Sequence, residues 1–286
     1  MKKRYGSIYT LPLGVWVTVF FVIPIAIVLV YAFLTKGAYG GVKLPFSLSA
    51  FEALFKNSFL IVSLRTLLIA FLSTLITILI ALPVSYFLAR TKNNTTLLLL
   101  VVIPFWVNFL IRIYAWIAIL GSEGFINDIL RNLGILAPGD SIQFLFNFWT
   151  VVIVHVYAFL PYAILPLFST IEKFDFNLLE AARDLGATHT RSLWSVLLPN
   201  IKGGIVTAIL FTFIPTLGSY AIPDLVGGTD TAMLGNLIAY NIKTANNWPL
   251  ASSISLVLTL LTSIGLLVYF FMNRSHSPVA LQEEIE

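Results

Sequence analysis

Cysteine is absent from this chain of 286 residues. Its absence excludes disulfide bonds, thiol catalysis and cysteine-based metal sites. Histidine is also scarce, because only His155, His189 and His276 occur and they lie far apart in the sequence. We therefore expect no zinc site and no resident metal cofactor in this chain.

Charged residues are unusually few. They make up 10% of the chain, whereas 58% of it is hydrophobic. A soluble domain carries about 25% charged residues, which cover its surface in water. The composition therefore predicts an integral membrane protein. The net charge of +4 does not indicate a nucleic-acid partner, because the basic residues lie at the ends of apolar segments rather than in one cluster.

Motifs of ATP hydrolysis and of common hydrolases are missing as well. The chain contains no Gly-Lys dipeptide, so it has no GxxxxGK[ST] phosphate-binding loop. It also lacks the HExxH and GxSxG patterns. We expect that this chain is not itself an enzyme and that any ATP is hydrolysed by another polypeptide. A membrane enzyme is the alternative, which turnover by the purified chain alone would reveal.

Six apolar stretches are long enough to cross a bilayer as helices. The first follows three basic residues, is longer than the apolar part of a signal peptide and has no cleavage site, so we expect it to be retained. Pro83 is expected to kink the second stretch, and Pro104 to interrupt the third. The fifth stretch is expected to be broken by Pro215, Gly218 and Pro223. The predicted spans are 11–34, 59–89, 96–120, 144–168, 203–226 and 249–272.

The segments between these stretches are predicted to be mostly irregular. Residues 35–57 are polar, with one short surface helix at 49–56. Residues 121–143 form a predicted loop, and residues 227–248 a polar, turn-rich segment.

The distribution of Lys and Arg predicts the orientation, because cytoplasmic loops are enriched in both. Six spans place both termini on one side. If that side is the cytoplasm, the inner segments hold ten basic residues and the outer segments five. Both termini are therefore predicted to be cytoplasmic. The inner ten are Lys2, Lys3, Arg4, Arg90, Lys92, Lys173, Arg183, Arg191, Lys202 and Arg274, and the outer five are Lys36, Lys43, Lys56, Arg131 and Lys243.

A polar segment at 172–200 falls on the predicted cytoplasmic side. It predicts a helix that begins near Asp175, whose carboxylate can cap free N–H groups, and ends at Gly186. A second helix is expected to begin after an N-cap at Thr188 and to stop at Pro199. Such a pair is typical of a short helix that enters a partner's groove, and an ordinary charged loop is the alternative.

The spacing of Glu180-Ala181-Ala182, Gly186 and Leu198-Pro199 resembles the EAA loop of importer-type ABC transporter permeases. The resemblance implies an all-α integral membrane protein with six transmembrane helices, the type I ABC importer permease fold. It also implies that this loop is the coupling helix that docks on the ATPase. The implied ATPase-coupling residues are Glu180, Ala181, Ala182, Arg183, Asp184 and Gly186.

The resemblance also divides the chain into three regions. Residues 1–58 would comprise a cytoplasmic start, the first span and a periplasmic loop. Residues 59–273 would form the permease core with its coupling loop at 172–200, and residues 274–286 a cytoplasmic tail.

Further motifs resemble spermidine/putrescine permeases. This resemblance implies polyamine import across a bacterial inner membrane by alternating access. It implies a second homologous permease, an ABC ATPase dimer that binds ATP and Mg, and a periplasmic substrate-binding protein as partners, with no cofactor in this chain. A permease for a different small substrate and a stand-alone secondary transporter are the alternatives. The motifs include Ile103-Pro104-Phe105-Trp106, Leu110-Ile111-Arg112-Ile113-Tyr114, Pro223-Asp224-Leu225-Val226-Gly227-Gly228 and Trp248-Pro249.

Several residues in or near the spans are candidates for the substrate pathway. A polycation is best met by carboxylates and aromatic faces. Arg112 would oppose a cation, and an arginine inside a membrane faces either a pathway or a structural partner. Solvation in loops is the alternative for the carboxylates, an interfacial belt for the aromatics, and a core position is expected for His155. The candidates are Asn108, Arg112, Tyr114, Trp116, Glu123, Tyr220 and Asp224.

Overall fold

This computed structural model describes residues 5–274. They fall into two compact units, which are described one at a time. The first unit holds the described residues up to Ser63 together with Leu234–Ser263. The second holds Leu64–Met233 and the described residues from Ile264 onward. The predicted tail at 274–286 lies outside the described residues except for its first position.

The first unit begins with an apolar rod. It consists of α1 (Tyr5–Val17), a π-helical turn (Thr18–Val22) and α2 (Ile23–Ala32). Its side chains from Thr10 on are almost all exposed, as expected for a helix whose solvent is lipid. This rod is the first predicted span, and it ends two residues earlier than predicted.

A β-hairpin follows the rod. Strand β1 (Leu34–Lys36) pairs with β2 (Val42–Phe46) in an antiparallel ladder. The turn between them is closed by Gly40 and Gly41, whose positive φ angles of 97° and 73° favour glycine. The sequence predicted no strand here. The prediction that residues 35–57 are mostly irregular was therefore wrong for the hairpin.

The rest of the first unit is helical. The predicted surface helix at 49–56 is present as α3 (Ser49–Glu52) and a 3₁₀ turn (Ala53–Phe55). The segment 227–248 was predicted to be turn-rich, but it contains a helix, α14 (Leu234–Lys243). The prediction was wrong in this part. Together with the start of α15 (Trp248–Arg274), these elements enclose a small core of Leu54, Leu234 and Ile254.

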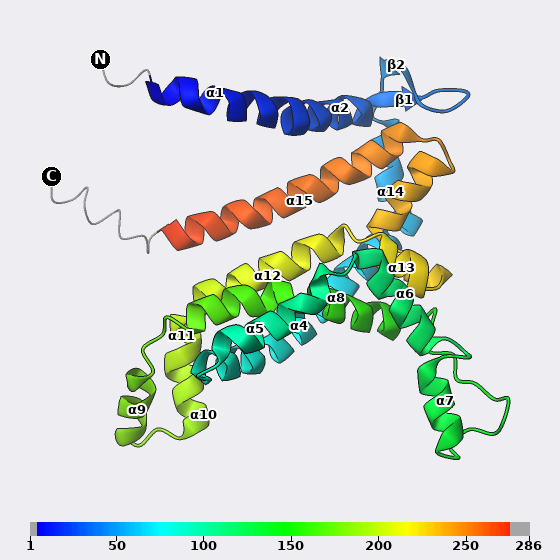
Figure 1. Cartoon of the computed structure of the whole chain (residues 1–286). Helices are drawn as coiled ribbons and strands as arrows, with labels where there is room; N and C mark the ends of the chain where they lie inside the picture. Colours follow the sequence, from blue (N-terminus) through cyan, green and yellow to red (C-terminus); the bar gives the residue numbers. More distant parts are fainter. Residues whose placement is uncertain (1–4, 275–286) are drawn as a thin grey trace. The chain divides into compact units, whose positions relative to one another are not determined.

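The second unit is built on long membrane helices. Helix α4 (Asn57–Arg90) begins in the first unit and continues here as the second predicted span, with Pro83 inside it. Helix α8 (Phe148–Ile171) packs along α12 (Lys202–Leu217), as Figure 1 shows. Two buried clusters form the core, one around Ile69, Val152 and Ile222 and the other around Ile164, Leu167 and Ile171.

The third predicted span is broken, as Pro104 indicated. It consists of α5 (Asn94–Val102), a 3₁₀ turn (Ile103–Trp106) and α6 (Phe109–Leu120). The break lies at Val107, whose ψ of 141° is extended. A further helix, α7 (Phe125–Asn132), occupies the segment predicted to be a loop.

The fifth predicted span is broken too. Helix α12 ends at Leu217, and α13 (Ala221–Val226) follows after three residues. The interruption falls at Gly218, one of the three predicted breaks, whereas Pro215 lies inside α12 and Pro223 inside α13. A 3₁₀ turn (Thr229–Thr231) follows α13, and this stretch of the second unit ends at Met233.

The described residues contain five helices that are long and apolar enough to cross a membrane. The number rises to six if His189–Asn200 and Lys202–Leu217, which meet at an angle of 73°, count as one span. This agrees with the six spans predicted from the sequence.

Candidate functional site

The coupling segment, defined as residues 172–200, forms two short helices. Asp175 accepts a hydrogen bond at Oδ1 from the Asn177 backbone N–H at 3.0 Å, and α9 (Asn177–Asp184) begins there. The Thr188 hydroxyl accepts from the Arg191 N–H at 3.3 Å, and α10 (His189–Ser192) follows. Both capping residues were predicted, because caps depend on local sequence.

Gly186 closes α9 with a Schellman motif. Its φ is +89°, a left-handed conformation that glycine adopts at little cost. The Gly186 N–H donates to the Arg183 carbonyl at 2.8 Å, and the Ala187 N–H donates to the Ala182 carbonyl at 3.0 Å. The predicted stop at Gly186 is therefore confirmed.

The expected stop at Pro199 was wrong by one residue. The chain continues from α10 through a π-helical turn (Leu193–Leu197) into α11 (Leu198–Asn200) and bends only at Ile201. Pro199 is the second residue of α11 and lies directly after the π-helical turn. Ile201 itself is fully buried.

Aromatic and polar contacts fix the coupling segment to the membrane helices. Leu179 of α9 is 2% exposed and belongs to the core of the second unit. Phe176 lies edge-on to Tyr86 at 6.1 Å, and the Arg90 guanidinium lies 5.5 Å from the Phe176 ring. Asn94 donates to Glu172 Oε1 at 2.9 Å. These contacts fix the start of the coupling segment to the membrane helices.

The opposite face of the coupling segment is exposed. Glu180, Ala181, Arg183, Asp184 and Gly186 are exposed, Ala182 is half-buried, and the Arg183 guanidinium contacts the His189 ring. Leu185 is 89% exposed and Trp194 is 68% exposed. The six predicted coupling residues therefore lie together beside exposed apolar side chains, an arrangement suited to docking.

Within the second unit, α9 and α10 lie at the opposite end from α6 and α7 (Figure 1). Helix α8 runs between these ends and has 24 residues, which corresponds to about 36 Å at 1.5 Å per residue. The coupling residues and the candidates on α6 are therefore separated by about one membrane thickness.

Four candidate pathway residues lie on or beside α6. Asn108 is the N-cap of α6, and its side chain accepts from the Leu110 N–H at 2.9 Å. Trp116 is half-buried and lies edge-on to Tyr157 at 5.4 Å. Tyr114 is 55% exposed. Asn108 therefore has a structural role that the sequence could have indicated, since Asn before an apolar helix is a capping signal.

Arg112 has an unusual environment. Its guanidinium carbon lies 4.6 Å from the centre of the Phe105 ring and 5.6 Å from that of Phe109. Its Nε and Nη1 atoms are buried and have no hydrogen-bond partner among the described residues. The aromatic faces of Phe105 and Phe109 are thus placed to interact with this charge.

Two candidates belong to α13. Tyr220 is its N-cap residue and is half-buried, whereas Asp224 lies in the first turn and is exposed. A carboxylate in the first turn of a helix is stabilised by the positive end of the helix dipole. The structure thus places an acidic and an aromatic residue together at a break between helices.

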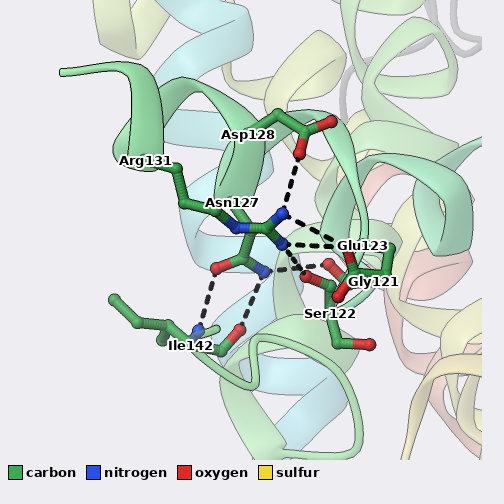
Figure 2. Close-up of polar contacts among 7 residues, drawn as sticks. All are labelled: Gly121, Ser122, Glu123, Asn127, Asp128, Arg131 and Ile142. Atoms are coloured by element: carbon green, nitrogen blue, oxygen red, sulfur yellow. Dashed lines mark hydrogen bonds and ion pairs between the residues drawn. The ribbon is translucent and has the colours of Figure 1, made fainter. Parts of the chain in front are cut away.

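Glu123 belongs to an ion-paired network in the segment that follows α6 (Figure 2). Arg131 lies 3.1 Å from Glu123 and 3.3 Å from Asp128, and it donates to the Ser122 carbonyl at 2.9 Å. Glu123 is therefore ion-paired although its side chain is 79% exposed, and its place in the substrate pathway stays a prediction. The sequence reasoning missed this role of Arg131, although Asp128 and Arg131 have the spacing of a helical ion pair.

Asn127 completes the network and was also missed. It is fully buried and accepts from the Ile142 N–H at 2.8 Å. It donates to the carbonyls of Gly121 and Ile142 at 2.9 and 3.0 Å. These bonds join both ends of the loop (Figure 2). His155, in contrast, has the core position predicted for it, with Nδ1 2.7 Å from the Val151 carbonyl.

Comparisons with known proteins agree with this architecture. The chain is 36% identical over 276 residues to the spermidine/putrescine transport system permease protein PotB of Haemophilus influenzae, covering 96% of both chains. It is 34% identical to PotB of Escherichia coli over 91% of this chain and 94% of that protein.

Solved structures give the same fold. A bacterial ABC transporter involved in the import of the acidic polysaccharide alginate matches with a TM-score of 0.77 at 17% identity, covering 96% of this chain and 97% of that one. This similarity confirms the predicted all-α ABC importer permease fold. Residues 62–279 match the family model described as binding-protein-dependent transport system inner membrane component. The chain therefore belongs to the family of inner-membrane components of binding-protein-dependent transport systems.

Proposed function

We propose that this chain is the permease subunit of an ATP-driven importer of spermidine and putrescine. The observation that carries the proposal is the 36% identity to a spermidine/putrescine permease across 96% of the chain. The exposed coupling residues supply what such a subunit needs on its inner side, a surface for a partner ATPase. The membrane helices supply the wall of a pathway.

The proposed complex assigns a task to each partner. A dimer of ABC ATPases binds ATP with Mg and docks on the coupling residues from Glu180 to Gly186. A second homologous permease completes the pathway, and a periplasmic binding protein delivers the substrate. Movement of the coupling segment then switches the helices of the core at 59–273 between inward-open and outward-open states.

Aromatic and acidic side chains on α6 and at the start of α13 favour a cationic substrate. Asp224 offers a carboxylate, and Tyr220, Tyr114 and Trp116 offer aromatic faces to an ammonium group. Breaks at membrane depth occur where backbone lines a cavity or is covered by protein. We therefore propose the break between α12 and α13 as part of the pathway.

One observation favours a second candidate, an anionic substrate. The Arg112 guanidinium lacks a hydrogen-bonded counter-charge among the described residues and lies in the first turns of α6. Positive charge combined with a helix N-terminus attracts anions and repels a polycation. The test of the proposal must therefore compare both kinds of substrate.

The proposal is tested on the purified complex in nanodiscs. We expect its ATPase activity to rise several-fold, by roughly three- to tenfold, when the binding protein is loaded with spermidine or putrescine, because substrate delivery favours the ATP-bound, outward-open state. The control is the ligand-free binding protein. Equal stimulation by the ligand-free protein, or stimulation only by an anionic ligand, would contradict polyamine import.

We also expect both termini in the cytoplasm, since Lys and Arg are concentrated in the inner segments. The native chain has no cysteine, so single cysteines at Ser7 and Ser141 report their own exposure. In intact cells, a membrane-impermeant thiol reagent should label Ser141→Cys and leave Ser7→Cys unlabelled. Labelling at position 7 with protection at position 141 would reverse the orientation.

A further inference from the structure

The outer helix α7 has an apolar face without a partner in the described part of the chain. Phe125 is 64% exposed, Ile129 is 40% exposed and Leu133, directly after the helix, is 68% exposed. Residues four apart lie on the same side of a helix, so the three form one stripe. We refer to Phe125, Ile129 and Leu133 as the α7 stripe.

The other side of α7 is held by its own loop. Asn127 is buried and bonds to Gly121 and Ile142, while Arg131 is enclosed between Glu123 and Asp128 (Figure 2). These contacts fix the rotation of α7 about its axis. The α7 stripe therefore cannot turn inward, and its exposure is imposed by the network.

Helix α7 lies close to the end of a membrane helix. Helix α6 ends at Leu120, and the connection at 121–124 is a tight turn in which the Gly124 N–H donates to the Gly121 carbonyl at 2.9 Å. Four residues can reach at most about 14 Å. Leu110 and Ile111 of α6 are exposed apolar side chains, as expected for a helix that faces lipid. The start of α7 is thus within reach of the headgroup region.

The charges on α7 exclude the bilayer interior. The segment Phe109–Asn132 has the length and composition to cross a membrane, but α7 itself carries Asp128 and Arg131. Charged groups are costly to place at the bilayer centre. An apolar face beside a charged face places a helix at the boundary between headgroups and acyl chains.

We propose that α7 is an interfacial helix whose stripe inserts into the leaflet at the end of α6. The area of the stripe favours lipid over a protein partner, because a stable protein interface takes about 20 to 30 residues from each side. Three apolar side chains suffice for a membrane contact when the helix is already tethered to a span. Since Arg131 is neutralised within the network, the contact needs no anionic lipid.

The absence of native cysteine allows a direct test in the assembled complex. Ile129→Cys carries a fluorescent label on the stripe, and Asp128→Cys carries it on the polar side as the matched control. Glu123 still holds Arg131 in the control. Both are reconstituted with cysteine-free partner subunits in nanodiscs whose lipids bear a spin label near the headgroup.

We expect the lipid-borne quencher to lower the emission from position 129 by roughly twofold or more and to change position 128 little, as for a helix lying in the interface. Iodide, a quencher dissolved in the water, should lower the emission from position 128 more than that from position 129. Quenching of position 129 by iodide as strong as at position 128 would place the stripe in water. Protection of position 129 from both quenchers would show that protein covers it. Either outcome overturns the proposal, and Leu133→Cys provides a second site if Ile129→Cys fails to assemble.

Discussion

Replacing Gly186 by proline is expected to uncouple transport from ATP hydrolysis while the membrane helices remain folded. The φ of +89° is inaccessible to proline, and the N–H that donates to Arg183 would be lost. The local cost is about 3 kcal/mol or more. Since about 1.4 kcal/mol corresponds to a tenfold change in an equilibrium, we expect transport to fall by more than tenfold.

The matched control is Gly186→Asn. Nothing lies within 4 Å of a Cβ at this position, so the substitution tests backbone conformation rather than space. Asparagine adopts the left-handed conformation more readily than other non-glycine residues. We expect the asparagine variant to transport within about twofold of the native complex. Transport and ATPase co-purification at native levels in the proline variant would refute the docking role of the coupling segment.

The second large effect is expected for Gly204→Val, which should destabilise the packing of α8 on α12. A Cβ at Gly204 would lie 2.8 Å from the Thr170 Cβ and 3.2 Å from the Pro166 carbonyl oxygen. The Thr170 hydroxyl is already bonded to that carbonyl at 2.8 Å, so the side chain cannot move away freely. Overpacking of this kind costs about 1 to 3 kcal/mol.

Gly203→Val provides the control for this prediction. It introduces the same side chain one residue earlier, where nothing lies within 4 Å. We expect Gly204→Val to lower the melting temperature of the detergent-solubilised complex by several degrees, about 2–4 °C per kcal/mol. Gly203→Val should leave it nearly unchanged. Equal melting temperatures would show that close contact at Gly204 does not limit stability, against the general use of small residues between membrane helices.

The sequence predicted the features that depend on local chemistry. Long apolar stretches indicated the spans, and single residues such as Asp175, Gly186 and Thr188 indicated helix ends. The breaks near Pro104 and Gly218 were predicted for the same reason, because proline and glycine act on their own neighbours.

Short polar elements could not be predicted in this way. The segment of α14 reads as turn-rich, yet Leu234 and Asn241 are buried, so packing rather than propensity stabilises this helix. The role of Glu123 was missed because its partner is eight residues away, across a turn whose path only the fold determines. Such contacts leave no periodic pattern in the sequence.

The joint at Ile201 has a mechanical consequence. The two helices that meet there are bent by 73° relative to each other, and the residue between them is fully buried in the core. Protein interiors are packed as densely as organic crystals and yield little to compression. A joint packed in this way leaves little freedom for independent movement of the two helices, so a displacement of α10 would be passed on to α12. If an ATPase docks on the coupling segment as proposed, its movement would reach the membrane helices through this joint.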